Sequence, residues 1–484
     1  MQYGFVKTAA LTPSIRVADC AYNARQIIEV LRGAAAAGAE IACLPELCIT
    51  GYTCGDLFFQ PVLQQGARDA LADVLRDTAG LPLLFVLGLP LTHGGKLYNC
   101  AAVCQNGRVL GVVPKTHLPN YNEFYEKRQF TPAPAENGVI DLSGAQVPFG
   151  TNLLFQCGTQ PALTLAVEIC EDLWAPLPPS TRHAMAGATL ICNLSASDET
   201  IGKAEYRRAL VTGQSARLLC GYVYADAGEG ESTTDMVFAG HNMVAENGAL
   251  LAETAPFCGG MALTDIDVER LAGERLKNTS FPAEDNANYE VIPFVLPQNV
   301  SPLTRIVSSA PFVPADAEQR ARRCDAILAM QASGLKKRLE HTHAKTAVVG
   351  ISGGLDSCLA LLVTVRAFSL LERPLSDIVA VTMPCFGTTE RTRTNAQRLC
   401  EALSVTQTVR SNFADIGQDE ARHDVTYENT QARVRTLVLM NLANRLGGLV
   451  IGTGDLSELA LGWATYNGDH MSMYGVNASV PKTL

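Results

Sequence analysis

The sequence predicts an α/β protein built from two units that a proline-rich connection joins. Short apolar runs typical of buried strands alternate with amphipathic helix patterns between residues 5 and 225. The same alternation returns between residues 346 and 453, and it indicates a parallel sheet with helical crossovers. Between residues 283 and 314, prolines interrupt short apolar pieces, as is common between domains. The predicted segments are a first domain at 1–275, a linker at 276–320 and a second domain at 321–484.

Composition excludes several classes of function. The 484 residues are 47% hydrophobic and carry a formal net charge of −10, so the chain has ample core and an acidic surface that argues against nucleic acid as a partner. No apolar run reaches the length of a membrane span, and the N-terminus lacks a signal-peptide pattern. The fifteen cysteines are scattered through apolar strands, which predicts reduced thiols in a cytoplasmic protein. Cys43, Cys48 and Cys54 do not have a zinc-site spacing, and we interpret them as structural.

The first domain begins with a strand, a helix and a second strand. Phe5 to Ala10 has a strand pattern, Asp19 starts a helix that runs to about Ala37, and Ile41 to Leu44 is a buried strand. Further strands are predicted at 83–88, 109–113, 163–169, 189–193 and 221–225. Helix patterns lie between several of these strands, which predicts a layered α/β domain with its functional residues at strand ends.

Three strand ends in this domain carry residues suited to covalent catalysis. Glu46 follows IACLP, Lys115 follows VVP, and Cys170 follows LAVEI. A cysteine nucleophile needs a base, and a carboxylate can take its proton. A lysine can stabilise both the thiolate and the oxyanion that forms when the thiolate attacks a carbonyl group. No histidine flanks these stretches in the pattern of a cysteine–histidine protease.

The second domain opens on a pattern typical of an anion-binding turn. Thr346 to Gly350 predicts a buried strand, Ser352-Gly353-Gly354 breaks it, and Cys358 to Val365 continues as a helix. Unpaired N–H groups at the helix start, together with glycines that let the backbone approach closely, favour phosphate. Asp356 is placed to bind Mg²⁺ beside it. The stretch matches neither GxGxxG nor GxxxxGK[ST].

The rest of the second domain alternates helices and strands around this turn. A helix at 315–339 precedes it, and the strand predicted at 377–383 ends in the polar stretch 384–389. Later elements are predicted as helices at 395–403 and 430–446 and as a strand at 448–453, which the polar stretch 454–458 follows.

The first domain resembles the nitrilase, or carbon–nitrogen hydrolase, superfamily. The resemblance rests on LPEL, PKTHLPNY and EICEDLW around Glu46, Lys115 and Cys170. It implies an α-β-β-α sandwich in which these three residues form the catalytic triad. It also implies a second glutamate, Glu126, beside the triad, and an oxyanion-hole N–H from Glu171. Tyr121, Ser197 and Lys203 match positions that bind glutamine in the glutaminase members.

The second domain resembles other known enzymes in several motifs. SGGLDS is similar to the pyrophosphate loop of the ATP pyrophosphatase superfamily. This resemblance implies a Rossmann-like adenine nucleotide alpha hydrolase fold for the second domain. TMPCFGTTERT, ENTQARVR and GTGDLSELALGWATYNGDHMSMYGVN are similar to NAD synthetase motifs. Together with the glutaminase-type domain, they identify the sequence as a member of the glutamine-dependent NAD synthetases, which adenylate deamido-NAD and amidate it with ammonia from glutamine.

This resemblance implies ligands for the second domain, with ATP as a substrate and Mg²⁺ as its cofactor. ATP contacts are expected at Gly350, Ile351, Ser352, Gly353, Gly354, Leu355, Asp356, Ser357 and Thr453. Deamido-NAD contacts are expected at Asn429, Glu458, Trp463, Ala464, Thr465 and Tyr466. Asp356 and Glu458 are expected to bind Mg²⁺, and the protein is expected to form a homo-oligomer without a membrane partner. The family pattern continues past a segment such as GVNASVPKTL, so we expect a truncated C-terminus, slow glutamine hydrolysis and little NAD synthesis.

Other functions remain as alternatives. A nitrilase-family amidase with a nucleotide-binding domain would share both motif sets. GMP synthetase pairs this type of ATP loop with a GxCxG glutaminase elbow, which is absent here, and asparagine synthetase needs an N-terminal cysteine where this chain has Met1-Gln2. A non-catalytic assembly protein would have two complete catalytic sets by coincidence.

Overall fold

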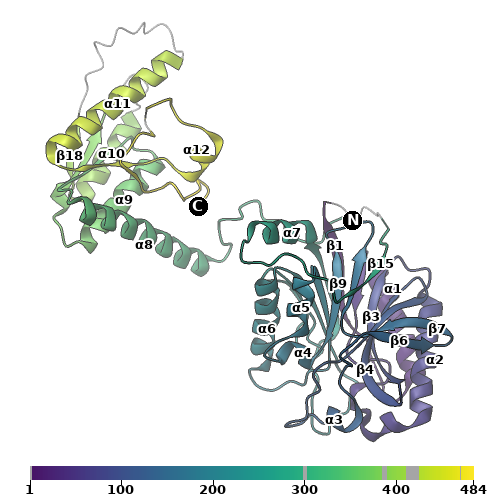
Figure 1. Cartoon of the computed structure of the whole chain (residues 1–484). Helices are drawn as coiled ribbons and strands as arrows, with labels where there is room; N and C mark the ends of the chain where they lie inside the picture. The colour runs from purple at the N-terminus through teal and green to yellow at the C-terminus, as the bar shows by residue number, and fades with distance from the viewer. Residues whose placement is uncertain (1–2, 298–301, 384–389, 410–424, 469) are drawn as a thin grey trace. The chain divides into compact units, whose positions relative to one another are not determined.

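The computed structural model describes residues 3–297, 302–383, 390–409, 425–468 and 470–484. The chain divides into two units, Met1–Ile306 and Val307–Leu484, and Figure 1 labels the elements of each. In the described part of the chain, no helix is both long and apolar enough to cross a membrane.

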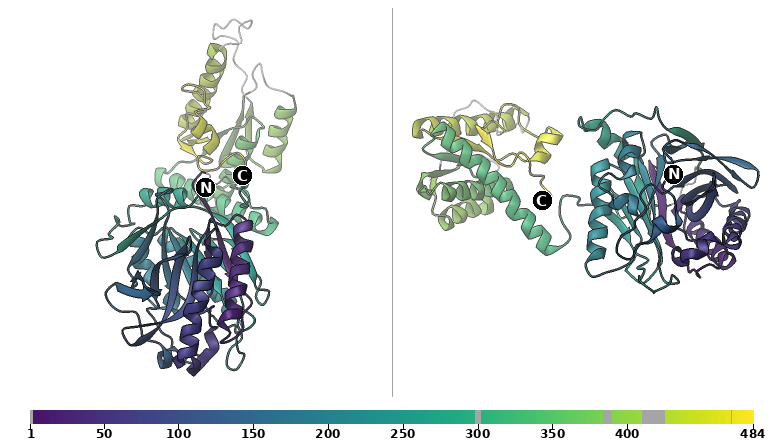
Figure 2. Two further views of the ribbon diagram at one scale, coloured as in Figure 1. Left: turned by 90° about the vertical axis from the view of Figure 1, so that its right-hand side faces the viewer. Right: turned by 60° about the horizontal axis from the view of Figure 1, so that its bottom comes forward.

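The first unit contains two stacked sheets between two helical layers (Figure 2). The eight-stranded sheet has the order β14 (Gly260–Asp267), β1 (Phe5–Thr12), β2 (Ile41–Cys43), β3 (Leu84–His93), β4 (Lys96–Gln105), β5 (Arg108–Pro114), β7 (Ala145–Phe149) and β6 (Gly138–Leu142). The seven-stranded sheet has the order β13 (Ala249–Glu253), β12 (Met243–Glu246), β11 (Gly221–Asp226), β10 (Leu190–Ser195), β9 (Thr164–Ile169), β8 (Leu153–Cys157) and β15 (Glu290–Phe294).

Helices cover the outer faces of these sheets. The helices of this unit are α1 (Cys20–Ala36), α2 (Pro61–Thr78), α3 (Glu126–Gln129), α4 (Glu171–Trp174), α5 (Pro179–Met185), α6 (Lys203–Leu218) and α7 (Val268–Lys277), with a 3₁₀ segment η1 (Tyr52–Phe59). One core cluster joins α1 and α2 to the first sheet, a second lies between the sheets, and a third joins α6 to the second sheet. The α-β-β-α sandwich expected from the sequence is therefore confirmed.

Local signals explain the elements that position the site. The side chain of Asp19 accepts the N–H of Tyr22 and caps α1, as the sequence predicts. Strands β9, β10 and β11 pair in parallel and are buried along their whole length, which explains their continuous apolar runs. Parallel pairing brings the carboxyl ends of neighbouring strands to one edge, where polar residues of the site follow them.

The first unit extends beyond the predicted boundary at residue 275. Strand β15 pairs in parallel with β8 at the edge of the second sheet, inside the segment predicted as a linker. Its sequence, EVIPF, contains a proline, which an edge strand tolerates but which favours a loop in a prediction. Farther on, Thr304 donates to Asp265, and Arg305 forms a two-pronged ion pair with Glu246.

The second unit is a five-stranded parallel sheet with helices on both faces. Its order is β18 (Thr406–Val409), β17 (Ile378–Thr382), β16 (Ala347–Gly350), β19 (Leu449–Gly452) and β20 (Tyr474–Gly475). The helices are α8 (Ala317–Thr342), α9 (Leu355–Leu370), α10 (Glu390–Ala402), α11 (Val425–Leu446) and α12 (Leu456–Leu461), with a 3₁₀ turn η2 (Leu375–Asp377). Helices α8, α9 and α10 contribute to the core on one face, and α11 packs on the other. The parallel sheet is confirmed, whereas the polar stretch predicted at 384–389 lies outside the described residues.

Candidate active sites

In the first unit, Lys115 lies between two carboxylates. Its Nζ atom is 2.6 Å from Oε1 of Glu46 and 2.6 Å from Oε1 of Glu126. All three side chains are buried, so water screens these ion pairs little. One ammonium group therefore holds together the two glutamates that the sequence analysis placed at the catalytic centre.

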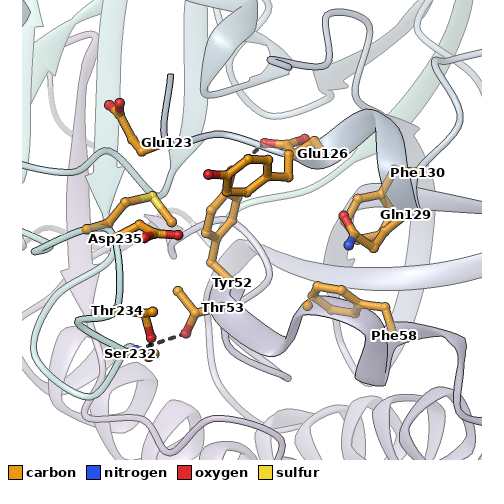
Figure 3. Close-up of a pocket in the computed structure, with 13 residues that line it drawn as sticks. Tyr52, Thr53, Phe58, Glu123, Glu126, Gln129, Phe130, Ser232, Thr234 and Asp235 are labelled. Carbon is orange, nitrogen blue, oxygen red and sulfur yellow. Dashed lines mark hydrogen bonds between the residues drawn. The ribbon is translucent and has the colours of Figure 1, made fainter. Parts of the chain in front are cut away.

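Neighbouring polar groups fix the orientation of the two glutamates. Asn99 donates its amide N–H to Glu46 Oε1 over 2.6 Å, and the N–H of Ala196 donates to Glu46 Oε2 over 3.1 Å. The hydroxyl of Tyr52 donates to Glu126 Oε1 over 2.9 Å, and Figure 3 shows these two side chains together. Asn99 and Tyr52 were not predicted as site residues, because no motif of their own marks them in the sequence.

A close approach of two backbone segments places Glu46. Gly88 in β3 lies against the turn from Pro45 to Leu47, and a Cβ atom at Gly88 would come within 2.2 Å of the Leu47 nitrogen. Such a distance is a backbone clash, so glycine is required here for the turn to pack on β3. The residue that seats the predicted base is thus a glycine in another strand.

The shared cation shifts the pKa values within this cluster. Burial opposes the charge of Lys115, but Glu126 and Glu46 outweigh it and raise the pKa of Lys115 well above its usual value. Burial raises the pKa of Glu126 to about 7, although Lys115 acts to lower it. Lys115 is therefore charged at neutral pH, and Glu126 is poised between its two protonation states.

Cys170 stands at a strained turn between β9 and α4. Its φ angle is +45°, in the left-handed region that non-glycine residues seldom adopt. Its N–H donates to Leu194 O over 2.9 Å and lies 3.2 Å from Asn193 Oδ1, and both acceptors belong to β10. Hydrogen bonds to the neighbouring strand thus hold the backbone of Cys170 in this conformation.

Electrostatic coupling joins Cys170 to the lysine–glutamate cluster. Burial is the main cause that raises the pKa of the Cys170 thiol well above its usual value. The charge of Glu46 raises this pKa further, and the charge of Lys115 lowers it. The resting group is therefore a thiol, and it needs a base such as Glu46 to become a nucleophile.

A buried aspartate joins the segments that carry Lys115 and Cys170. Asp172 accepts the N–H of His117 over 2.8 Å through Oδ1 and the N–H of Ile169 over 3.0 Å through Oδ2. Burial raises the pKa of Asp172 to about 8, against the effect of these N–H donors. Asp172 was not predicted, although EICEDLW has two consecutive acids after the cysteine, of which it is the second.

The predicted glutamine-binding residues fall into two groups near Cys170. The Tyr121 hydroxyl donates to the carboxylate of Glu171, at 2.9 Å from Oε1. Lys203 forms an ion pair with Asp198, and its Nζ lies 5.4 Å from the ring centre of Phe124 and 5.5 Å from that of Trp174. These groups provide a carboxylate and an ammonium, the charges that an amino-acid head group needs.

The third of these predicted residues, Ser197, is buried after the end of β10. Its N–H donates to Asp226 Oδ1 over 2.8 Å, and its hydroxyl oxygen accepts from Arg207 Nη2 over 3.2 Å. Ser197 is therefore held from both its backbone and its side chain.

A cavity of about 180 Å³ opens beside Tyr52 and Glu126 (Figure 3). Glu123 and Asp235 also line it, and its lining contains no lysine or arginine. Cys170 is not among its lining residues. The cavity therefore reaches the Glu126 side of the cluster, and its charged lining is acidic.

In the second unit, the predicted phosphate loop joins β16 to α9. Gly353 has a φ of +84°, which glycine adopts at little cost. The Gly354 N–H lies 3.2 Å from Ser352 Oγ, and the Ser357 hydroxyl donates to Gly354 O over 3.0 Å. These contacts close a tight loop at the start of a 16-residue helix, where the dipole favours a phosphate group.

Three carboxylates gather beside this loop around a lysine. Oxygen atoms of Asp356, Asp455 and Glu458 lie within 4.8 Å of one another. The Nζ atom of Lys482 is 3.2 Å from Asp356, 3.5 Å from Asp455 and 3.4 Å from Glu458. Carboxylate oxygens are the ligands that a hard divalent cation prefers, so this set of donors fits Mg²⁺. The ammonium group of Lys482 already occupies a position among the three carboxylates that suits a positive charge. Asp356 and Glu458 were predicted as metal ligands, whereas Asp455 and Lys482 were not predicted as part of the site.

Asn477 links the phosphate loop to the end of β19. Its buried amide donates to Asp356 O over 2.9 Å and to Thr453 O over 3.1 Å. The two predicted ATP-contact segments, which are about a hundred residues apart along the chain, therefore share one hydrogen-bond donor.

The predicted deamido-NAD residues are brought together only in part. Asn429 on α11 accepts the N–H of Tyr466 over 3.0 Å, which seats the 463–466 segment on that helix. Trp463 and Tyr466 are 78% and 73% exposed, so their rings present a large apolar surface to solvent. Glu458 lies instead in the carboxylate cluster.

Comparison with known proteins gives consistent matches along the whole chain. The carbon–nitrogen hydrolase family matches residues 7–275, and the NAD synthase family matches residues 327–483. A glutamine-dependent NAD(+) synthetase of Mycobacterium tuberculosis is 46% identical over 100% of this chain and 74% of its own length. One from Mycobacterium leprae is 44% identical over 99% and 74%. A solved glutamine-dependent NAD+ synthetase from Acinetobacter baumannii, in complex with ADP, is 25% identical with a TM-score of 0.47, and it covers 99% of this chain and 80% of that one.

Proposed function

This chain belongs to the glutamine-dependent NAD(+) synthetases, which are carbon–nitrogen ligases, and on that premise we propose a role for each residue of its two sites. Cys170 is the nucleophile that takes the amide group of glutamine, and Glu46 is its base. The second unit activates deamido-NAD with ATP. The observation that carries this proposal is the buried Lys115 between Glu46 and Glu126, with the Cys170 thiol under the influence of the same charges.

Glutamine hydrolysis begins when Glu46 accepts the proton of the Cys170 thiol. The sulfur attacks the carboxamide carbon, and the oxyanion is stabilised by Lys115 and by the N–H of Glu171. The protonated Glu46 returns the proton to the departing nitrogen, so ammonia leaves and a thioester remains. Glu46 then takes a proton from water, which attacks the thioester and releases glutamate.

Recognition of glutamine uses the charged groups around Cys170. Lys203 pairs with the α-carboxylate of the substrate, and Ser197 donates its hydroxyl to the same end. Glu171, held by Tyr121, faces the α-ammonium group. The zwitterionic head group of glutamine thus pairs with the ammonium of Lys203 and the carboxylate of Glu171. A simple amide has neither charge and would pair with neither residue.

In the second unit, ATP is the substrate of an adenylation. The backbone of residues 350–357 holds the phosphates, and Thr453 contacts the nucleotide. The carboxylate of deamido-NAD, seated by Asn429 and the 463–466 segment, attacks the α-phosphorus, and pyrophosphate leaves. Ammonia then attacks the acyl carbon and displaces AMP, which gives NAD. Mg²⁺ held by Asp356 and Glu458 would neutralise phosphate charge when bound.

We also propose that the protein works as a cytoplasmic homo-oligomer. The described cysteines are all free thiols, which suits a reducing compartment. Leu459 and Leu461 expose apolar side chains next to the carboxylate cluster, which suits burial against another copy. Light scattering of the purified protein tests the assembly, and a monomer at micromolar concentration would contradict it.

The functional test compares glutamine with ammonium as nitrogen donor in NAD synthesis. Cys170→Ala should abolish glutamate release and glutamine-dependent synthesis but retain whatever ammonium-dependent synthesis the parent shows. Asp356→Asn should lose synthesis from both donors and keep basal glutamate release. NAD formation from purified glutamine by the Cys170→Ala variant would refute the assignment of the nucleophile.

A further inference from the structure

Arg207 is a fully buried arginine on α6, one helical turn beyond Lys203. Its exposed fraction is 0%, and its guanidinium group faces the segment that follows β10. Nη1 donates to Glu199 Oε2 over 2.9 Å, and Nη2 donates to Asp198 O over 3.1 Å. Nη2 also donates to the hydroxyl of Ser197 over 3.2 Å. A single side chain therefore binds three consecutive residues, 197 to 199.

These three residues form part of the candidate binding site for the amino-acid head group of glutamine. Ser197 and Lys203 are its predicted ligands, and Asp198 forms the ion pair that places the Lys203 ammonium. Because Arg207 holds the hydroxyl of Ser197 and the backbone of Asp198, it sets the position of both ligands relative to each other. Among the described residues, none of its hydrogen bonds reaches Glu46, Lys115 or Cys170.

The surroundings of Arg207 balance its buried charge. Burial opposes its charged form, but the nearby carboxylates of Asp226 and Glu199 outweigh this and raise the pKa of Arg207. Asp226 also accepts the N–H of Ser197. Ser197 is therefore bound through its backbone by Asp226 and through its hydroxyl group by Arg207. His241 Nδ1 lies 3.1 Å from Nη1, and burial lowers the pKa of His241, which keeps this ring a neutral acceptor.

We propose that Arg207 is a positioning residue for glutamine: it fixes the Ser197–Glu199 segment so that Ser197 and Lys203 meet the head group of the substrate. This inference rests on the proposed glutaminase function. Loss of the guanidinium removes a donor from the partly buried carboxylate of Glu199 and leaves the carbonyl group of the buried Asp198 without it, and the segment must move for that carbonyl group to reach water. The catalytic cluster keeps its own contacts, so binding of glutamine should suffer more than the chemical step.

The first experiment measures steady-state glutaminase kinetics of Arg207→Met in the full chain. We expect the KM for glutamine to rise tenfold or more, with kcat changed less than threefold. Arg208→Met is the matched control, because Arg208 is the next residue of the same helix and forms a partly exposed ion pair with Glu253. Arg207→Lys keeps the charge with fewer donors, so its KM should lie between those of the parent and Arg207→Met.

The second experiment separates positioning of the substrate from general damage. Iodoacetamide alkylates a reactive cysteine and has an amide but no amino-acid head group, so the alkylation rate of Cys170 in Arg207→Met should equal that of the parent. An unchanged KM, or an alkylation rate that falls in parallel with glutamine turnover, would overturn the inference. If Arg207→Met does not fold, Arg207→Lys carries the same two measurements with the same criteria. A parent without glutaminase activity would instead overturn the proposed function.

Discussion

Replacing Lys115 with methionine tests the charge arrangement at the centre of the first unit. The lysine is the only cation within hydrogen-bonding distance of Glu46 and Glu126 among the described residues. Methionine fills a similar volume without a charge. Each Oε1 atom lies 2.6 Å from the same Nζ, so the two oxygens cannot be farther apart than twice that distance. The variant therefore leaves two buried carboxylates facing each other.

The cost follows from the repulsion between these carboxylates. Two unit charges on the order of 5 Å apart repel by about 3 kcal/mol at an effective dielectric constant of about 20. Removal of one partner from a buried ion pair destabilises proteins by about 3–5 kcal/mol, which agrees in size. One carboxylate can escape the repulsion by taking up a proton. We therefore expect the free energy of unfolding to fall by about 3–5 kcal/mol at pH 8 and by less at pH 5.5.

Urea unfolding followed by tryptophan fluorescence measures this loss. The chain has two tryptophans, Trp174 in the first unit and Trp463 in the second, so a Trp463→Phe background reports on the first unit alone. Adding Glu126→Gln to Lys115→Met removes one of the two facing charges. The double variant should therefore regain most of the stability, about 3 kcal/mol, that the repulsion costs. Glutamate release should also fall on the order of 10²–10³-fold, because an oxyanion partner is lost. Parent-like stability of Lys115→Met at pH 8, with no pH dependence, would refute the arrangement.

Three further predictions follow from single contacts. The pKa of Glu126 is raised to about 7 in the folded chain, so its contribution to stability should fall as pH rises from about 4.5 to about 7, by up to about 3 kcal/mol. Glu126→Gln should remove this pH dependence in urea unfolding, and an unchanged profile would contradict it. Asp172→Asn should slow glutamate release on the order of tenfold to hundredfold, because Asp172 fixes the segments of both Lys115 and Cys170, whereas Asp141→Asn, at the exposed end of β6, should have no effect. Lys482→Met should strengthen binding of Mn²⁺ alone, measured by electron paramagnetic resonance titration, because the competing ammonium is gone; equal affinity in variant and parent would show that Lys482 does not compete for this site.

The sequence predicts those parts of the fold and sites that local patterns encode. Continuous apolar runs mark the parallel strands, and Asp19 marks the start of α1. Glu46, Lys115 and Cys170 could be named because each follows a strand and has an unusual residue type for that position. The glycine turn at 352–354 is similarly visible, since strand, glycines and helix occur within a dozen residues.

Contacts that depend on register between distant segments could not be predicted. Asn99 reaches Glu46 from β4, and Tyr52 reaches Glu126 from η1, yet neither lies in a motif of its own. Lys482 joins the carboxylates only because β20 returns the chain to β19 and Leu456 N pairs with Val480 O. Strand β15 was not predicted because its proline favours a loop in a sequence pattern, although an edge strand tolerates proline.

Each unit thus holds a lysine among carboxylates, and burial decides what the lysine can do. Lys115 is buried with both glutamates, so its removal from the cluster would leave two buried carboxylates without a cation and without water. Lys482 is 49% exposed, so its ammonium can exchange the carboxylates for solvent at small cost. A permanent cation suits the first unit, where the proposed mechanism forms an oxyanion beside Lys115 in every turnover. An exchangeable cation suits the second unit under the proposed function, because Asp356 and Glu458 would have to release Lys482 to bind Mg²⁺ with ATP, and Lys482 would again reduce their mutual repulsion after the metal ion leaves.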